Sequence, residues 1–125
     1  NSDSIPVIAP LGINIYSKQT DDNILNINAD TAASFISNNM RSEKIIFLTD
    51  VEGVLDHNKR LISKMTKSQA NELLKSGIIS GGMIPKIEAC LYGIQNGGSA
   101  HIIDGRDPGA LLQCIENKII GTKII

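Results

Sequence analysis

The segment Lys44-Ile45-Ile46-Phe47-Leu48-Thr49, which runs directly into Asp50-Val51-Glu52-Gly53, decides the fold. A continuous apolar run of this length is typical of a parallel strand that is buried on both faces. Ala100–Ile103 and Ile119–Ile125 are predicted as further strands. Because segments with helical features separate these runs, the sequence predicts an α/β fold, a three-layer α/β/α domain with a mostly parallel central sheet.

Helix-boundary residues mark the segments between the strands. Thr66-Lys67-Ser68-Gln69 is a capping box that begins a helix. Gly77 ends that helix, and Pro85 suits the first turn of the next one. The predicted helices run from Asp30 to Met40, from Thr66 to Ser76, from the Ser80–Lys86 segment to about Gln95, and from Pro108 to Glu116.

Two hairpins and a short strand complete the predicted elements. Ile5–Leu11 is predicted as a short buried strand whose prolines limit its pairing. Gly12–Asn28 has alternating apolar arms around the polar tip Lys18–Asn23, which indicates a hairpin. A second hairpin is expected around the polar stretch Asp56–Arg60.

Composition excludes several classes of protein. The chain has 125 residues, with 12 Lys or Arg, 13 Asp or Glu and a net charge of −1. This balance argues against an electrostatic grip on nucleic acid or on an anionic membrane. No apolar run approaches the roughly 18 residues of a membrane span. Cys90 and Cys114 are isolated and far from any zinc-ligand spacing, so we expect reduced core residues and no metal site.

The Ser80-Gly81-Gly82 segment and Lys86 point to an anion. Paired glycines before a helix leave backbone N–H groups open to a phosphate. A lysine in the first helical turn is disfavoured by the helix dipole, which indicates an anionic partner. A plain glycine-rich turn with a solvated lysine accounts for the same residues equally well.

The run Asn26-Ile27-Asn28-Ala29-Asp30 offers polar side chains to a ligand. Alternation along an extended strand would place Asn26, Asn28 and Asp30 on one face, where they could hold a lysine. Asp30 alone could equally be a helix cap. A calcium loop is disfavoured, because Thr31 stands where glycine is needed and Ser37 where glutamate is needed.

Two acidic segments follow predicted strands. Asp50 could bind ribose or a metal ion, or it could cap a turn. Asp104-Gly105-Arg106-Asp107 is predicted to be an internally salt-bridged turn rather than a ligand site. Neither a Walker A motif nor a GxGxxG motif is present, which disfavours a P-loop enzyme and a classical dinucleotide fold.

Five segments together resemble the amino acid kinase family, and within it the acetylglutamate kinases. They are Asn26–Ala33, Leu48–Leu55, Ile78–Lys86, His101–Arg106 and Gly121–Thr122, in that order. The resemblance implies transfer of a phosphoryl group from ATP to the side-chain carboxylate of N-acetyl-L-glutamate, a step of arginine biosynthesis. A kinase for a homologous acyl amino acid such as acetylaminoadipate, or a non-catalytic regulatory module of the same fold, are the alternatives.

The resemblance also implies roles for individual residues. Lys86 would stabilise the transferring phosphoryl group, Asp30 would orient Lys86, and Asn26 and Asn28 would serve the amino-acid substrate. Mg²⁺ would be carried on the nucleotide phosphates, with no protein metal site. The residues implied in nucleotide binding are Thr49, Asp50, Val51, Glu52, Gly53, Val54, Leu55, Ile78, Ile79, Ser80, Gly82 and Met83.

Family chains are about twice this long, so residues 1–125 are expected to be the C-terminal, nucleotide-binding half, with the N-terminal half absent and no activity alone. The family implies a homo-oligomer (dimer or hexamer), a possible PII-type regulator, and a cytoplasmic location, or a plastid in a photosynthetic eukaryote. Gly109, Cys114 and Ile119 replace the histidine, glutamate and glycine of arginine-inhibited members. Loss of an acidic group weakens the case for guanidinium binding.

Overall fold

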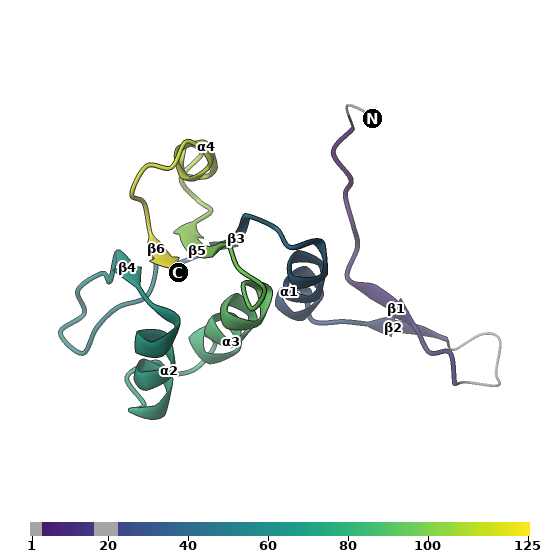
Figure 1. Cartoon of the computed structure of the whole chain (residues 1–125), viewed down its shortest axis with the longest axis horizontal. Coiled ribbons are helices and arrows are strands. Elements are labelled where there is room, and N and C mark those ends of the chain that lie inside the picture. Colours follow the sequence, from purple (N-terminus) through teal and green to yellow (C-terminus); the bar gives the residue numbers. More distant parts are fainter. Residues whose placement is uncertain (1–3, 17–22) are drawn as a thin grey trace.

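The central sheet is built on two long neighbouring strands, β3 (Lys44–Thr49) and β5 (Ser99–Asp104), which pair in parallel along their whole length (Figure 1). The computed structural model describes residues 4–16 and 23–125. β6 (Thr122–Ile124) pairs antiparallel with β5, and β4 (Lys64–Met65) pairs parallel with β6. The order β3-β5-β6-β4 therefore has two parallel pairings and one antiparallel pairing, which confirms the mostly parallel sheet.

Helices cover both faces of this sheet, as the three-layer prediction requires (Figure 1). The helices are α1 (Ala29–Met40), α2 (Lys67–Lys75), α3 (Met83–Gly93) and α4 (Ala110–Ile115). All correspond to predicted helices, with ends that differ by a few residues. In Figure 1, α1, α2 and α3 lie on one side of the sheet and α4 on the other.

Helix α3 is the centre of the hydrophobic core. Ile87 and Cys90 are fully buried against the sheet, where they meet Phe47 and Ile102. Full burial of an aliphatic side chain of this size stabilises the fold by about 1.5–3 kcal/mol. A smaller cluster lies under α4, formed by Ile103, Ala110 and Cys114 with Ile46 and Ile120 against it. Cys90 and Cys114 are both free and buried, which confirms the prediction of reduced core cysteines.

Small residues bring α1 close to α3. The Ser37 hydroxyl donates to the Gly93 carbonyl at 3.1 Å. A Cβ on Gly93 would lie 3.5 Å from the Ser34 backbone, so the two helices meet nearly backbone to backbone. The buried side of α1 is therefore polar, whereas Ile36 and Met40 of its apolar stripe stay exposed.

Strand β3 is not buried on both faces, contrary to the prediction. Phe47 is buried, but Leu48 on the opposite face is 53% exposed. The reason is its position: β3 is the edge of the sheet in the described part of the chain, and α4 packs near Ile46 and Ile103 rather than over Leu48. An apolar run therefore does not show by itself whether the strand lies in the centre of the sheet or at its edge.

The prediction of a buried strand over Ile5–Leu11 is also wrong. Only Leu11 is in a strand, and Val7 is 95% exposed. Pro6 and Pro10 lack the N–H groups that a strand ladder needs, and in the described residues no strand pairs with residues 5–9 to bury them.

Both predicted hairpins are present. β1 (Leu11–Ile13) pairs antiparallel with β2 (Ile24–Asn26), although residues 18–22 of the predicted tip lie outside the described residues. Leu55 and Leu61 form an antiparallel bridge around the 56–60 turn. The short strand β4 was not predicted. Among the described residues, no helix has the length and apolar character needed to cross a bilayer.

The capping box of α2 forms as predicted and can be tested. Thr66 Oγ1 accepts from the Gln69 N–H at 3.2 Å, and Gln69 Oε1 accepts from the Thr66 N–H at 2.8 Å. Thr66→Ala should lower the free energy of unfolding by about 1 kcal/mol in urea denaturation, because an N–H of the first turn loses its partner. Ser68→Ala, an exposed neighbour in the same turn, is the control and should change little. Equal losses in the two variants would contradict the role of the cap.

Candidate active site

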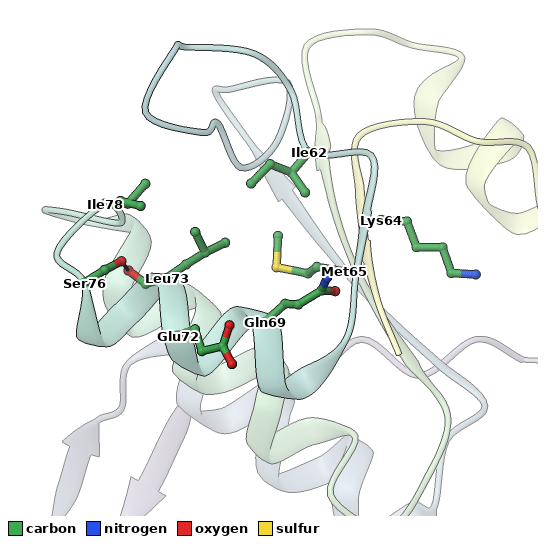
Figure 2. Close-up of a pocket in the computed structure, with 8 residues that line it drawn as sticks. All are labelled: Ile62, Lys64, Met65, Gln69, Glu72, Leu73, Ser76 and Ile78. Carbon is green, nitrogen blue, oxygen red and sulfur yellow. Dashed lines mark hydrogen bonds between the residues drawn. The ribbon is translucent and has the colours of Figure 1, made fainter.

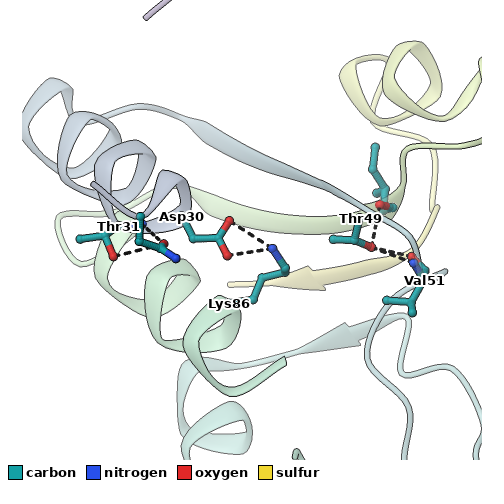
Figure 3. A network of polar contacts seen from close by, with 7 residues as sticks. Asp30, Thr31, Thr49, Val51 and Lys86 are labelled. Atoms are coloured by element: carbon teal, nitrogen blue, oxygen red, sulfur yellow. Dashed lines mark hydrogen bonds and ion pairs between the residues drawn. The ribbon is translucent and has the colours of Figure 1, made fainter. Parts of the chain in front are cut away.

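An ion pair joins the N-terminal ends of α1 and α3. Lys86 Nζ lies 2.8 Å and 3.1 Å from the two carboxylate oxygens of Asp30 (Figure 3). The side chains are 20% and 25% exposed, so the pair is partly shielded from water yet reachable. This contact joins the two residues for which the sequence predicted catalytic roles.

Asn28, not Asp30, caps α1. The Asn28 Oδ1 accepts from the Thr31 N–H at 3.1 Å, which satisfies one of the open donors of the first turn. Because the helix begins at Ala29, Asp30 does not continue the strand face that carries Asn26, and the predicted placement of Asp30 on that face is wrong. The carboxylate of Asp30 pairs with Lys86 instead of capping the helix.

Lys86 sits where the helix dipole disfavours a cation, in the first turn of α3. Two neighbours offset this cost. One is the Asp30 carboxylate, and the other is the ring of Phe47, whose centroid is 5.6 Å from Nζ. The face of an aromatic ring attracts an ammonium ion at this range. The anionic partner expected from the sequence is, within this chain, Asp30.

The backbone that opens α3 is uncovered. Gly82 is the N-cap and makes no side-chain cap hydrogen bond, and Gly81 has φ +58°, which favours glycine. A Cβ built on either glycine meets nothing within 4 Å. The positive end of the α3 dipole therefore faces open space beside Lys86, a suitable environment for phosphate.

A hollow of about 200 Å³ lies next to this helix end. It brings together two segments that are far apart in the sequence. Every lining residue belongs to the set for which the sequence predicted nucleotide contact: Val51, Gly53, Val54, Leu55, Ile78, Ile79, Ser80 and Met83. The lining is mainly apolar, which suits a flat base more than a charged group.

Thr49 organises the turn after β3 rather than facing the hollow. Its hydroxyl donates to the Val51 carbonyl at 2.7 Å and accepts from the Val51 N–H at 3.2 Å (Figure 3). It also lies 3.2 Å from the Ile103 carbonyl of the neighbouring strand. Asp50 and Glu52 in the same turn are exposed. The hydroxyl of Thr49 is thus occupied within the protein.

A larger hollow of about 420 Å³ lies between α2 and the segment that leads into β4 (Figure 2). Ile62, Met65 and Leu73 supply apolar walls, and Gln69 and Glu72 lie at its rim. Of the predicted site residues only Ile78 reaches it. Volume alone is therefore a poor guide to the chemistry of this protein.

Thr122 is a site-supporting residue that sequence reasoning left without a role. Its fully buried hydroxyl accepts from the Val54 N–H at 2.8 Å and donates to the Ile62 carbonyl at 2.7 Å. A Cβ on Gly53 would lie 2.6 Å from this hydroxyl oxygen, so only glycine allows the approach. The sequence signal for this residue was the Gly121-Thr122 motif. Gly121 has φ +62°, and a Cβ built on it would overlap the Ile102 carbonyl oxygen.

The Asp104–Asp107 segment is the salt-bridged turn that the sequence predicted. Arg106 Nη2 lies 2.7 Å from Asp104 Oδ2, and the Arg106 backbone N–H donates to Asp104 Oδ1 at 3.0 Å. These hydrogen bonds lower the pKa of Asp104 to about 2. The carboxylate is therefore ionised and committed to the turn.

The amino acid kinase family model matches residues 1–104, and the chain belongs to that family. It is 50% identical over 113 residues to the acetylglutamate kinase of Campylobacter fetus subsp. fetus, covering 90% of this chain and 39% of that protein. It is 46% identical over 126 residues to the acetylglutamate kinase of Helicobacter hepaticus, covering 99% and 44%. The chain thus spans about two fifths of the length of these relatives.

Solved structures share the fold. Carbamate kinase from Giardia lamblia bound to AMP-PNP has a TM-score of 0.67 at 27% identity, over 86% of this chain and 36% of that chain. N-acetylglutamate synthase from Neisseria gonorrhoeae complexed with coenzyme A and L-arginine has a TM-score of 0.78 at 22% identity, over 94% and 26%. The second match concerns the fold alone.

The buried Thr122 hydroxyl provides a test of how the hollow is held. Thr122→Val keeps the shape but leaves the Val54 N–H and the Ile62 carbonyl without a partner, which should cost about 1–3 kcal/mol of unfolding free energy. Thr122→Ser retains the hydroxyl and should lose less. Urea denaturation of both variants measures the difference, and a valine variant as stable as the serine variant would contradict the anchoring role.

Proposed function

We propose that this chain is the nucleotide-binding half of an acetylglutamate kinase. In this reaction the γ-phosphoryl group of ATP passes to the side-chain carboxylate of N-acetyl-L-glutamate. The observation that carries the proposal is the Asp30–Lys86 ion pair, which lies at two helix N-termini beside the hollow formed by segments 51–55 and 78–83. The relatives named acetylglutamate kinase support the choice of acceptor.

The geometry suits phosphoryl transfer because that reaction depends on positioning and charge neutralisation. A base in the small apolar hollow would direct its phosphates toward the open N-terminus of α3. Lys86, one helical turn along, would then neutralise charge that develops on the transferring group. Asp30 would hold the ammonium group in place.

The substrate side of the site is assigned to Asn26 and Asn28. Asn26 ends β2 with an exposed side chain, and Asn28 caps α1 two residues before Asp30. Their amides can donate to and accept from the polar groups of an acyl amino acid. Thr49 would act indirectly, through the turn that carries Val51.

Mg²⁺ would arrive with the nucleotide, bound to its phosphate oxygens. In the described residues, no group of three or more His, Cys, Asp and Glu side chains is placed to hold a metal ion. Asp50, which is exposed directly after β3, would be able to accept a hydrogen bond from a water bound to this Mg²⁺.

We further propose that an N-terminal half completes the domain. Its contact surface would include the free edge of β3 and the apolar stripe of α1, where Ala32 and Ile36 face a hollow of about 480 Å³ together with Ile8. Pairing with β3 would cover Leu48, which is otherwise exposed. Assembly as a homodimer or hexamer and binding of a PII-type regulator rest on the family resemblance.

Lys86→Ala tests the role of the ammonium group in the complete enzyme. We expect kcat to fall far more than KM for acetylglutamate changes, because the charge acts mainly in the transition state. Steady-state kinetics with MgATP measures both constants, and Lys75→Ala, an exposed lysine on α2, is the control. An effect confined to KM would reduce Lys86 to a ground-state binder.

Asp30→Asn tests whether the carboxylate orients Lys86. The helix cap belongs to Asn28, so the melting temperature should stay near that of the wild type. Activity should fall by roughly 10² or more, the scale for loss of an electrostatic group in a preorganised site. Glu88→Gln, an exposed neutralisation on α3, is the matched control. A kcat near that of the wild type would remove Asp30 from the mechanism.

A further inference from the structure

The sheet face opposite α3 carries a row of basic side chains. In the strand register, His101 of β5 lies directly beside Lys123 of β6, and Lys123 lies directly beside Lys64 of β4. Residues paired in this way point to the same face of a sheet. The two neighbouring rows, one with Ile102 and the other with Met65, face α3 and the main core. Figure 2 shows Lys64 pointing away from α2, in agreement with this placement.

A hollow of about 320 Å³ lies over this basic row. The loop that leads from α4 to β6 forms its other wall. The lining contains three lysines and no acidic residue: Ser63, Lys64, His101, Asn117, Lys118, Ile119, Ile120 and Lys123. It shares no lining residue with the hollow of the proposed nucleotide site.

The lysines of this hollow differ in whether they form a salt bridge with another described residue. Lys118 Nζ pairs with Glu116 at 2.8 Å. Lys44, at the edge of the same face, donates to the Cys114 carbonyl at 2.7 Å and to Asn117 Oδ1 at 2.9 Å, so its ammonium group holds the α4 loop. Among the residues that the structure describes, Lys64 and Lys123 form no salt bridge. Like charges directly opposite each other in a sheet are destabilising.

His101 adds a buried polar group to the same wall. His101 is only 4% exposed, and its Nε2 lies 3.1 Å from the Ser99 hydroxyl oxygen. Burial, followed by the charges of Lys44 and Lys123, lowers the pKa of His101 to about 4. The imidazole is therefore neutral near pH 7, with one ring nitrogen able to donate and the other able to accept.

We propose that this hollow binds a small dianion, with Lys64 and Lys123 as its charge partners and His101 as a neutral hydrogen-bonding wall. A carboxylate or phosphate dianion would relieve the repulsion between the two lysines and form charge-assisted hydrogen bonds with them. Lysine ammonium groups bind compact anions and, unlike the planar guanidinium group of arginine, do not select one planar geometry. The site is independent of the proposed kinase reaction, because neither Lys86 nor the 51–55 segment contributes to it.

Residues 1–125 carry their own probe for this site, since His57 and His101 are the two histidines of this chain. Histidine-selective ¹³C NMR of the complete protein at constant neutral pH would follow both rings while sodium phosphate or sodium succinate is added at matched ionic strength. We expect saturable shifts of the His101 signals, with His57, on the exposed 56–60 turn, unchanged. Response to one salt alone identifies the dianion as phosphate or as dicarboxylate.

Lys123→Gln separates a binding role from a structural one. It should weaken the His101 response about tenfold or more, as expected when a charge-assisted hydrogen bond is lost. It should leave the melting temperature without ligand unchanged or higher, because a like-charge contact is removed. Lys118→Gln, whose ammonium group is paired with Glu116, is the control and should bind as the wild type does.

Three results would overturn the proposal. One is the absence of a saturable His101 shift with either salt. Another is an equal shift in wild type and Lys123→Gln, which would mean that the anion acts elsewhere. The third is an equal response to L-arginine, whose guanidinium group has no carboxylate partner among the residues that line this hollow.

Discussion

Helices α1 and α3 run parallel and touch where small residues let their backbones approach. The Ser37–Gly93 contact and the Asp30–Lys86 contact both join residues 56 positions apart, so the helices are in register over two turns. Each helix precedes one of two parallel strands, β3 and β5. Their N-termini therefore meet at the carboxyl ends of those strands, the edge at which open α/β sheets bind ligands. A bulky residue at position 93 would separate the helices and with them the ion pair.

The loops around this edge are held by hydrogen bonds of threonine hydroxyl groups rather than by their own regular structure. Thr122 joins the 53–54 segment to Ile62, and Thr49 joins the turn after β3 to Ile103. These hydroxyl groups are satisfied inside the protein, so the backbone that they hold can line a hollow without a helix or strand of its own. Positioning of this kind is what a phosphoryl-transfer site requires.

The two faces of the sheet differ in chemistry. The α3 face is apolar around Ile87 and Ile102, apart from the Lys86 ammonium group over Phe47. The opposite face is covered by α4 only near Ile103, and beyond it the face carries His101, Lys123 and Lys64. Since the period of a strand is two, one short segment such as β6 can bury Ile124 on one side and present Lys123 on the other.

Local patterns predicted the elements, because capping boxes, glycine stops and apolar runs depend on neighbours in the sequence. The α2 cap, the helix ends and the Asp104–Arg106 turn are of this kind. Motif resemblance also singled out Asp30 and Lys86, although spacing alone left open whether Asp30 was a cap. The structure shows that Asn28 takes the cap, through a local contact with Thr31. Only the tertiary structure decided that Asp30 meets Lys86, because that contact depends on helix packing.

The sequence also did not predict whether an apolar segment would be buried or exposed. Ile5–Pro10 and Leu48 have strand-like composition, yet burial requires a neighbouring element, and none covers them in the described residues. The basic row of His101, Lys123 and Lys64 arises in the same way, from residues brought together by strand register. The sequence by itself determined the helices, the turns and the two long strands β3 and β5, because those preferences are local. The tertiary structure alone decided which side chains meet, because register and helix packing join positions that are dozens of residues apart.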